Sequence, residues 1–374
     1  MNIVEGYSNN DNLNIAFDKS TEKIIGDCTL ILFFASSKYD FKKLSQLFKE
    51  KYPNTKIVGT TTNGEIGKDI NFGEGNLLVI GITESKLNIE VNVIKNIEEK
   101  VITSMFEIKE SIEKLNITKT SKDSFGLLFV DGLSSSEEKV LAILKPLFGT
   151  EFSIVGGSAG DSSLKNTYIS YNGEIYQNAA ILILVKTSLP FKVYKENIYT
   201  PMTEEIFRIT KTDNQRTIYE INNEKALDFY ARLLGKTAQE VTENDLFYHP
   251  LGKIIEEELY ITSPMSINKT EKSITFYANV QVGQSMMVLT NKNILDENRK
   301  TVSNIKKELQ NSELTICFNC VLRYMQMNQE RIGKEVYAEL SKISNHVIGF
   351  TTLGEQYNFK HCNQTLTLIT IGGI

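Results

Sequence analysis

A repeated unit with a glycine-rich turn is the feature that most constrains the fold of this 374-residue chain. Residues 56–66 (KIVGTTTNGEI) and 346–356 (HVIGFTTLGEQ) share an apolar run, a glycine, four further residues, a second glycine and then a glutamate. A shorter relative, residues 153–161 (SIVGGSAGD), ends in Asp161. Three copies of one pattern predict three copies of one supersecondary structure.

Each turn has the same predicted elements on both sides. A strand, an amphipathic helix and a second strand precede the turn, and another apolar strand follows it. The predicted helices are residues 40–52, 135–148 and 330–343, the second opened by a capping box of Ser135 and Glu138, and the predicted final strands are residues 76–83, 179–185 and 365–371. A β-α-β crossover is right-handed and pairs parallel strands, so a returning antiparallel strand makes each sheet mixed. Asn172-Gly173 predicts a hairpin turn after the second glycine turn. The fold class predicted is therefore two-domain α/β, with mixed sheets built from repeated β-α-β-Gly loop-β units.

The segment of residues 190–312 does not follow the repeat. It contains predicted strand pairs around Asp213-Asn214 and around Gly283, a helix that ends at Gly235, and a helix over residues 296–309. We expect this segment and the third repeat to form a second domain. The predicted division is an N-terminal extension (1–25), a first domain (26–195) and a second domain (196–374).

The glycine turns carry groups that suit a small zwitterion. Hydroxyl and backbone N–H groups bind a carboxylate, and acids at the ends of the turns bind an amine. The alternative is that these are tight turns with internally capped hydroxyls. The candidate ligand-binding residues are Thr60, Thr61, Gly64, Glu65, Asp131, Gly157, Ser158, Asp161, Cys320, Arg323, Thr351, Thr352 and Glu355.

Three of these candidates lie at strand ends outside the turns. Asp131 follows a predicted strand in FVDG, where it binds an amine or serves only the turn. Arg323 forms a bidentate pair with a ligand carboxylate or a salt bridge with a nearby acid. Cys320 belongs to a CxxC spacing with Cys317, which we interpret as structural because the two positions fall on opposite faces of a strand.

Composition and motifs exclude several functional classes. The net charge of −5 argues against a partner such as nucleic acid or an anionic membrane surface. The glycine turns lack the Lys-Ser/Thr pair of a P-loop, no catalytic triad can be assembled, and none of the three histidines lies in a metal-binding spacing. We therefore predict a protein that is not an enzyme and holds no metal. No apolar run approaches the roughly 20 residues of a membrane span, and the N-terminus has no signal-peptide pattern, so we expect a cytoplasmic protein.

At these residues the chain resembles the FIST domain family, a sensory module of bacterial signalling proteins with N and C parts. The matching pieces are IVGTTTNGEI, FVDGLSSSEEKVLAIL, IVGGSAGD, RITKTDNQRTIYEINNEKALDFY, the C-x-x-R of FNCVLR, and VIGFTTLGEQYN followed by NQTLTL. The resemblance implies ligand sensing, with amino acids as proposed ligands. It also implies a signalling partner such as a histidine kinase, a diguanylate cyclase or a chemoreceptor.

The sequence therefore predicts a stand-alone intracellular sensor that binds a small polar, amino-acid-like ligand and signals to a separate partner. The predicted cleft lies between the glycine turns and the strand that ends at Cys320. The alternative, implied by the same resemblance, is a haem-binding nitric-oxide sensor that regulates a histidine kinase or a diguanylate cyclase. The cofactor is left open, because no histidine matches the family's haem ligand.

Overall fold

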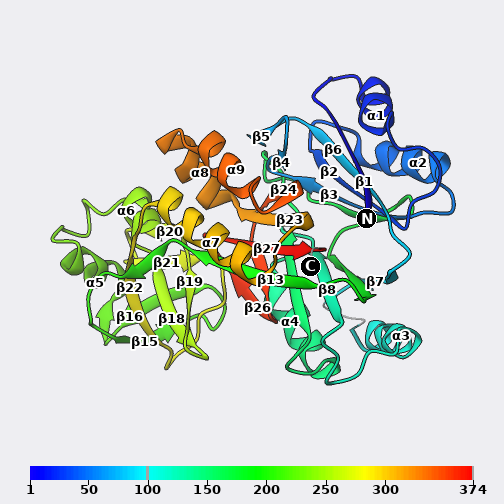
Figure 1. Cartoon of the computed structure of the whole chain (residues 1–374). Helices are drawn as coiled ribbons and strands as arrows, with labels where there is room; N and C mark the ends of the chain where they lie inside the picture. The colour runs from blue at the N-terminus through cyan, green and yellow to red at the C-terminus, as the bar shows by residue number, and fades with distance from the viewer. Residues whose placement is uncertain (98–100, 373–374) are drawn as a thin grey trace. The chain divides into compact units, whose positions relative to one another are not determined.

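The computed structural model describes residues 1–97 and 101–372. Contacts divide the chain into two compact units. Unit one comprises Met1–Glu196, Asn298–His361 and Leu366–Ile374, and unit two comprises Asn197–Glu297 and Cys362–Thr365. Figure 1 shows the whole chain, coloured from the N-terminus to the C-terminus.

Unit one contains three six-stranded sheets with the same internal order. The first sheet is β1 (Asn2–Ser8), β6 (Leu77–Thr83), β2 (Leu30–Ser36), β3 (Lys56–Thr62), β10 (Ile169–Tyr171) and β11 (Glu174–Tyr176). The second is β7 (Leu87–Lys95), β12 (Ala179–Thr187), β8 (Ser124–Val130), β9 (Ser153–Ser158), β25 (Glu355–Tyr357) and β26 (Lys360–Cys362). The third is β13 (Phe191–Asn197), β27 (Thr365–Ile371), β23 (Ser312–Cys320), β24 (Ser344–Thr352), β4 (Glu65–Gly67) and β5 (Asn71–Gly73).

The pairing inside each sheet follows the predicted repeat. β2 with β3, β8 with β9, and β23 with β24 are parallel. The returning strands β6, β12 and β27 are antiparallel to β2, β8 and β23. The predicted α/β class with mixed sheets is thus confirmed.

The short hairpin that follows each glycine turn joins a different sheet from the strand before the turn. β4 of the first repeat pairs with β24 of the third, β25 of the third pairs with β9 of the second, and β10 of the second pairs with β3 of the first. The exchange is cyclic and ties the three repeats together. The hairpin of the second repeat has its turn at Asn172-Gly173, as predicted. The hairpins of the first and third repeats were not predicted, because the returning strand was expected directly after the turn.

The strand glycines of the repeat allow close approach between parallel neighbours. A Cβ on Gly156 would lie 1.9 Å from the carbonyl oxygen of Leu128, and a Cβ on Gly349 would lie 1.9 Å from that of Cys317. At the equivalent Gly59 a Cβ would lie 2.0 Å from the ring of Phe33. Any side chain would therefore force the strands apart.

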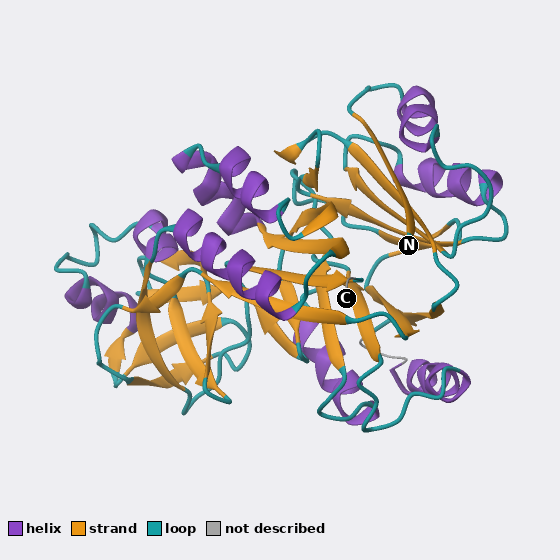
Figure 2. Ribbon diagram, viewed as in Figure 1, coloured by secondary structure: helices purple, strands orange, loops and turns teal. Residues whose placement is uncertain are grey.

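The inner faces of the three sheets share one core, and helices cover the outer faces of the first two sheets (Figure 2). Phe34, Phe129 and Phe318 occupy equivalent positions on the three first strands, and all belong to the common core. Their rings meet that of Phe350, with centroid distances of 5.0, 6.1 and 5.6 Å. Aromatic burial from each repeat thus holds the three repeats together.

The predicted helices of the first two repeats are present, two helices that were not predicted accompany them, and the third repeat differs from the prediction. α1 (Leu13–Thr21) and α2 (Phe41–Lys51) cover the first sheet, and α3 (Val101–Lys114) and α4 (Glu137–Leu144) cover the second. A short 3-10 helix, η1 (Lys145–Leu147), follows α4. Instead of one helix over 330–343, the third repeat has α8 (Val321–Glu330) and α9 (Gly333–Leu340).

The ends of the helices confirm some of the sequence-based predictions and contradict one. Asp40 caps α2 by accepting a hydrogen bond from the Lys43 N–H. The predicted capping box of Ser135 and Glu138 is wrong, because the residue at the cap is Ser136 and its side chain makes no capping bond. Ser135 instead adopts a positive φ of 53°. The predicted helix near residues 296–309 is α7 (Ile294–Glu308).

Unit two is built on one larger sheet with two short helices, α5 (Ala226–Leu233) and α6 (Glu243–Tyr248). The strand order is β19 (Glu258–Thr262), β18 (Leu251–Ile255), β22 (Ser285–Asn291), β15 (Phe207–Thr212), β16 (Thr217–Ile221), β21 (Ser273–Phe276) and β20 (Pro264–Asn268). β14 (Tyr199–Pro201) pairs with β22, and β17 (Glu224–Lys225) pairs with β16.

Unit two also corrects one expectation. The strands around Asp213-Asn214 pair as predicted, but β21 and β22 around Gly283 are not neighbours in the sheet. The strands of the third repeat belong to unit one, so the segment inserted between β13 and β23 forms unit two largely without them. The sequence boundaries 1–25, 26–195 and 196–374 stay a prediction about domains.

Candidate functional site

The three glycine turns meet inside unit one and hydrogen-bond to one another through their backbones. The bonds between turns are Asn63 N to Thr351 O (3.2 Å), Thr351 N to Gly64 O (2.7 Å), Gly160 N to Thr61 O (2.9 Å), Ser158 N to Gly354 O (2.8 Å) and Leu353 N to Ser158 O (3.2 Å). The predicted turn residues are therefore brought together. They form a buried junction in which backbone groups already have partners.

Glu65 and Glu355 are fully buried at this junction. Glu65 accepts hydrogen bonds from the Thr62 hydroxyl, from the Asn76 N–H at 2.9 Å and from the Asn76 amide at 3.1 Å. Burial raises the pKa of Glu65 to about 7, although the bonds from Thr62 and Asn76 oppose that shift. Glu355 accepts a bond from the Thr352 hydroxyl.

The second turn and the strand end beside it are also internally bonded. The Ser158 hydroxyl donates to Glu137 at 3.1 Å and accepts from the Gln356 amide at 3.0 Å. Gly157 faces Thr352, since a Cβ there would lie 2.3 Å from Cγ2 of Thr352. The Thr60 hydroxyl donates to the Thr61 carbonyl at 3.0 Å.

Asp131 acts as a turn residue in this structure. Its carboxylate accepts bonds from the Thr167 hydroxyl, the Leu133 N–H at 3.3 Å and the Asn178 N–H at 2.5 Å. The side chain is 4% exposed. Its oxygens therefore stabilise the loops after β8 and before β12.

Cys320 and Arg323 lie at the end of β23 and in the first turn of α8. Both are buried, and Arg323 forms an ion pair with buried Glu196 and a 2.6 Å bond to Asn319 Oδ1. Of the two alternatives drawn from the sequence, the structure places the guanidinium against a protein acid. Burial raises the pKa of the Cys317 thiol to about 12, which keeps it protonated at neutral pH.

One junction between repeats differs from the other two in the segment after its turn. In the first and third repeats the turn acid itself begins the next strand, since Glu65 begins β4 and Glu355 begins β25. In the second repeat β10 begins only at Ile169, so residues 161–168 form an extra loop. This loop faces the segment that connects β2 to α2.

Asp161 organises the extra loop. It accepts hydrogen bonds from the Ser163 N–H and hydroxyl, from the Lys165 N–H at 2.8 Å and from the Asn166 N–H at 2.9 Å. Burial alone would raise the pKa of Asp161, but these bonds outweigh burial and hold the pKa below its usual range. Asp161 is therefore ionised and bonded to its own loop.

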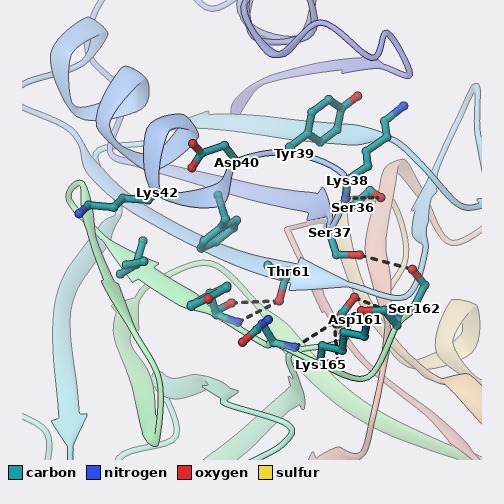
Figure 3. Close-up of a pocket in the computed structure, with 15 residues that line it drawn as sticks. Ser36, Ser37, Lys38, Tyr39, Asp40, Lys42, Thr61, Asp161, Ser162 and Lys165 are labelled. Atoms are coloured by element: carbon teal, nitrogen blue, oxygen red, sulfur yellow. Dashed lines mark hydrogen bonds between the residues drawn. The ribbon is translucent and has the colours of Figure 1, made fainter.

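The loop and the β2–α2 connection enclose a cavity of about 640 Å³ (Figure 3). Ser37 and Ser162 lie across from each other with their hydroxyl oxygens 3.4 Å apart. Phe41 and Tyr168 stack with a centroid distance of 6.1 Å. The lining residues are Ser36, Ser37, Lys38, Tyr39, Asp40, Phe41, Lys42, Thr61, Asp161, Ser162, Ser163, Lys165, Asn166, Tyr168 and Ile175.

Charges of both signs surround this cavity, which we call pocket one. Lys38 already pairs with Asp11 at 2.8 Å and bonds to the Asn9 carbonyl. Lys42, Lys165 and the helix-capping Asp40 are exposed at its edge. The arrangement can bind an acid with lysines and serine hydroxyls and an ammonium with Asp40.

Among the thirteen candidates taken from the sequence, Thr61 and Asp161 line pocket one. Asp131 is buried in the loops after β8 and before β12, and the other ten are buried in the junction or around Arg323. Sequence reasoning missed the residues of 36–42 and 162–168. The available signal was the spacing after the second turn. The hairpin turn at Asn172-Gly173 lies further along the chain from its glycine turn, GGSAGD, than the hairpins of the other two repeats lie from theirs.

The three histidines have protein neighbours in this structure. His346 Nδ1 lies 2.6 Å from Glu5, and His249 Nδ1 lies 3.1 Å from the Leu289 carbonyl. The His361 ring packs against Gly354. None of the three lines pocket one or the three other cavities bordered by residues within 90–176, 5–78 and 29–186. Within residues 1–97 and 101–372, no group of three His, Cys, Asp or Glu side chains is placed to hold a metal ion.

Comparison with known protein families matches residues 29–224 to the FIST N domain and residues 226–358 to the FIST C domain. A search of curated proteins found no match. None of the helices in the described part of the chain combines the length and apolar character of a membrane-spanning helix. Because the two matches cover nearly the whole chain, the protein belongs to the FIST family of sensory, signal-transduction domains.

Proposed function

We propose that this protein senses a small polar ligand in pocket one and passes the signal to a separate partner protein. The observation that carries the proposal is the cavity of about 640 Å³ at the one repeat junction with an extra loop. At the other two junctions the chain enters its next strand directly at Glu65 and Glu355. A volume of this size is within the range of small-molecule sites.

The chemistry of pocket one supports an amino-acid-like ligand. Exposed Lys42 and Lys165 offer charge-assisted hydrogen bonds to a carboxylate, and the hydroxyls of Ser37 and Ser162 add neutral donors. The stacked rings of Phe41 and Tyr168 offer an apolar surface to a ligand side chain. The buried turn acids are not needed as ligand groups in this proposal, since their oxygens serve the junction.

A thermal-shift screen with amino acids and small organic acids tests the proposal. A ligand at 100 times its Kd adds about 2.7 kcal/mol to the free energy of unfolding. Ser162→Tyr fills the cavity from an exposed position, and Lys165→Ala removes one cation. Lys334→Ala is the matched control, because Lys334 is an exposed lysine of α9 outside the pocket.

We expect a selective hit whose shift is abolished by Ser162→Tyr, reduced by Lys165→Ala and unchanged by Lys334→Ala. A hit that persists in Ser162→Tyr would refute pocket one as the site. Silence across the whole panel would refute the amino-acid-like ligand.

The proposed partner is a signalling protein such as a histidine kinase, a diguanylate cyclase or a chemoreceptor. The support is membership of a signal-transduction family. Co-purification of candidate partners with and without the screened ligand tests it. We expect the ligand to change the amount recovered, and a partner that is recovered equally in both states would contradict ligand-dependent signalling.

A further inference from the structure

A second cavity, of about 810 Å³, lies between α3 and the edge strand β7 in the second repeat. It shares no lining residue with pocket one. We call it pocket two. Figure 1 shows α3 beside the end of the second sheet that carries β7. In the first repeat, α1 covers the equivalent edge strand β1.

The strand registers identify Asn92 of β7 as the equivalent of Gly6 of β1. In each repeat the residue is reached by starting at the strand glycine and following the paired residues across three neighbouring strands. The first path runs from Gly59 through Phe33 and Val79 to Gly6. The second path runs from Gly156 through Leu128 and Leu182 to Asn92.

The exchange of glycine for asparagine changes how closely the covering helix can lie on the edge strand. In the first repeat α1 lies directly on the strand, since a Cβ on Gly6 would be 2.1 Å from the Ser20 carbonyl oxygen. In the second repeat the Asn92 side chain occupies that position, so α3 cannot approach as closely. The Ser111 hydroxyl of α3 donates to Asn92 Oδ1 at 2.8 Å and fixes the side chain in the wall of pocket two.

Asn92 leaves a donor without a protein partner inside this wall. The residue is 6% exposed, and its Nδ2 has no hydrogen-bond partner among the described residues. A buried amide donor without an acceptor costs roughly 1–3 kcal/mol. An oxygen acceptor on a bound molecule would remove that cost.

The charged residues around pocket two indicate which second group such a molecule carries. Glu107 and Glu110 are three residues apart on α3, line the cavity and form no ion pair within the described part of the chain. Glu90 is already paired with Lys114 at 2.7 Å. Lys95 lies over the Tyr176 ring at 5.0 Å. Two carboxylates without a cation favour a ligand with an ammonium group.

We propose that pocket two is a second ligand site, for a small primary amine that also carries a hydroxyl or carbonyl oxygen. The ammonium group binds Glu107 and Glu110, and the oxygen accepts a hydrogen bond from Asn92 Nδ2. The site goes beyond the proposed function, because it is separate from pocket one and binds its own class of ligand.

The test is isothermal titration calorimetry of the full chain with ethanolamine and 4-aminobutyrate as probes and succinate as the anionic comparator. The double variant E107Q/E110Q removes both charges from exposed positions. Glu113→Gln is the matched control, because Glu113 is an exposed glutamate of α3 outside the cavity. Asn92→Leu removes the donor, and Ser162→Tyr blocks pocket one.

We expect saturable binding of at least one amine probe and none of succinate. E107Q/E110Q should weaken binding about tenfold or more, in line with the loss of a charge-assisted hydrogen bond. Asn92→Leu should also weaken it, whereas Glu113→Gln and Ser162→Tyr should leave it within about twofold. Loss of amine binding in Ser162→Tyr would assign the amine to pocket one and overturn the proposal while leaving the proposed function intact. Absence of saturation by either amine, or equal weakening by Glu113→Gln, would also overturn it.

Discussion

The surroundings of Glu65 predict how the free energy of unfolding changes with pH, in direction and in size. The carboxyl group is fully buried in the turn junction, and burial raises its pKa from an ordinary 4.5 to about 7. The folded protein therefore binds the proton more tightly than the unfolded chain does. Stability from this group is fully present below about pH 4.5 and is lost as the pH rises to about 7.

The magnitude follows from the same two values. A pKa raised from 4.5 to about 7 corresponds to about 3 kcal/mol of stability lost across that pH range. Glu65→Gln keeps the shape and cannot ionise. Its carbonyl oxygen can still accept the two bonds from Asn76, while its amide faces the Thr62 hydroxyl.

The assay is urea denaturation at pH 4.5, 6, 7 and 8, followed by circular dichroism because the chain has no tryptophan. We expect the variant to gain about 3 kcal/mol relative to the wild type between pH 4.5 and pH 8. Gln46→Ala, a neutral change at an exposed position of α2, should show a constant difference from the wild type. A difference between Glu65→Gln and the wild type that does not change with pH would refute the reasoning.

Three further predictions concern the junction and its surroundings. Arg323→Met leaves Glu196 buried without its cation and should lower the free energy of unfolding by about 3–5 kcal/mol. In thermal melts, the double variant Arg323→Met/Glu196→Gln should recover part of that loss. No recovery would contradict the ion-pair account. Gly156→Ala places a Cβ 1.9 Å from the Leu128 carbonyl and should cost at least about 2 kcal/mol in urea denaturation, whereas a neutral effect would mean that the parallel strands separate freely. Asp161→Asn weakens the bonds that hold the extra loop, so trypsin should cleave after Lys165 faster than in the wild type, and an unchanged rate would show that Asp161 does not organise the loop.

The repeated core of the fold could be predicted from the sequence. Apolar strands, an amphipathic helix and a glycine that permits close strand contact lie in one order, so local pattern and tertiary structure agree. Gly59, Gly156 and Gly349 mark equivalent strand positions in both the sequence and the structure. The hairpin turn at Asn172-Gly173 was also readable, with φ values of 49° and 91°.

The cyclic exchange of hairpins could not be predicted. Strands of three residues, such as β4 and β25, carry too little pattern to identify their partner, and the partner lies far away in the chain. The same limit explains the third repeat. Its strands are separated in sequence by the inserted segment, and only tertiary contacts show that they belong to unit one.

The candidate site was only partly predictable for a different reason. Glu65, Glu355 and Arg323 have the chemistry of ligand-binding groups, but burial and internal partners decide whether they are available. Those partners come from other segments, such as Glu196 for Arg323. Pocket one depends instead on the length of the loop after Asp161, which a search for motifs does not register.

Hydrogen–deuterium exchange measured by mass spectrometry, with and without the ligand that gives the largest thermal shift, tests the central claim most directly. If the ligand binds in pocket one, residues 36–42 and 161–168 should be protected, and Ser162→Tyr should lose that protection. Protection confined to residues outside these two segments, with pocket one unchanged, would contradict the claim.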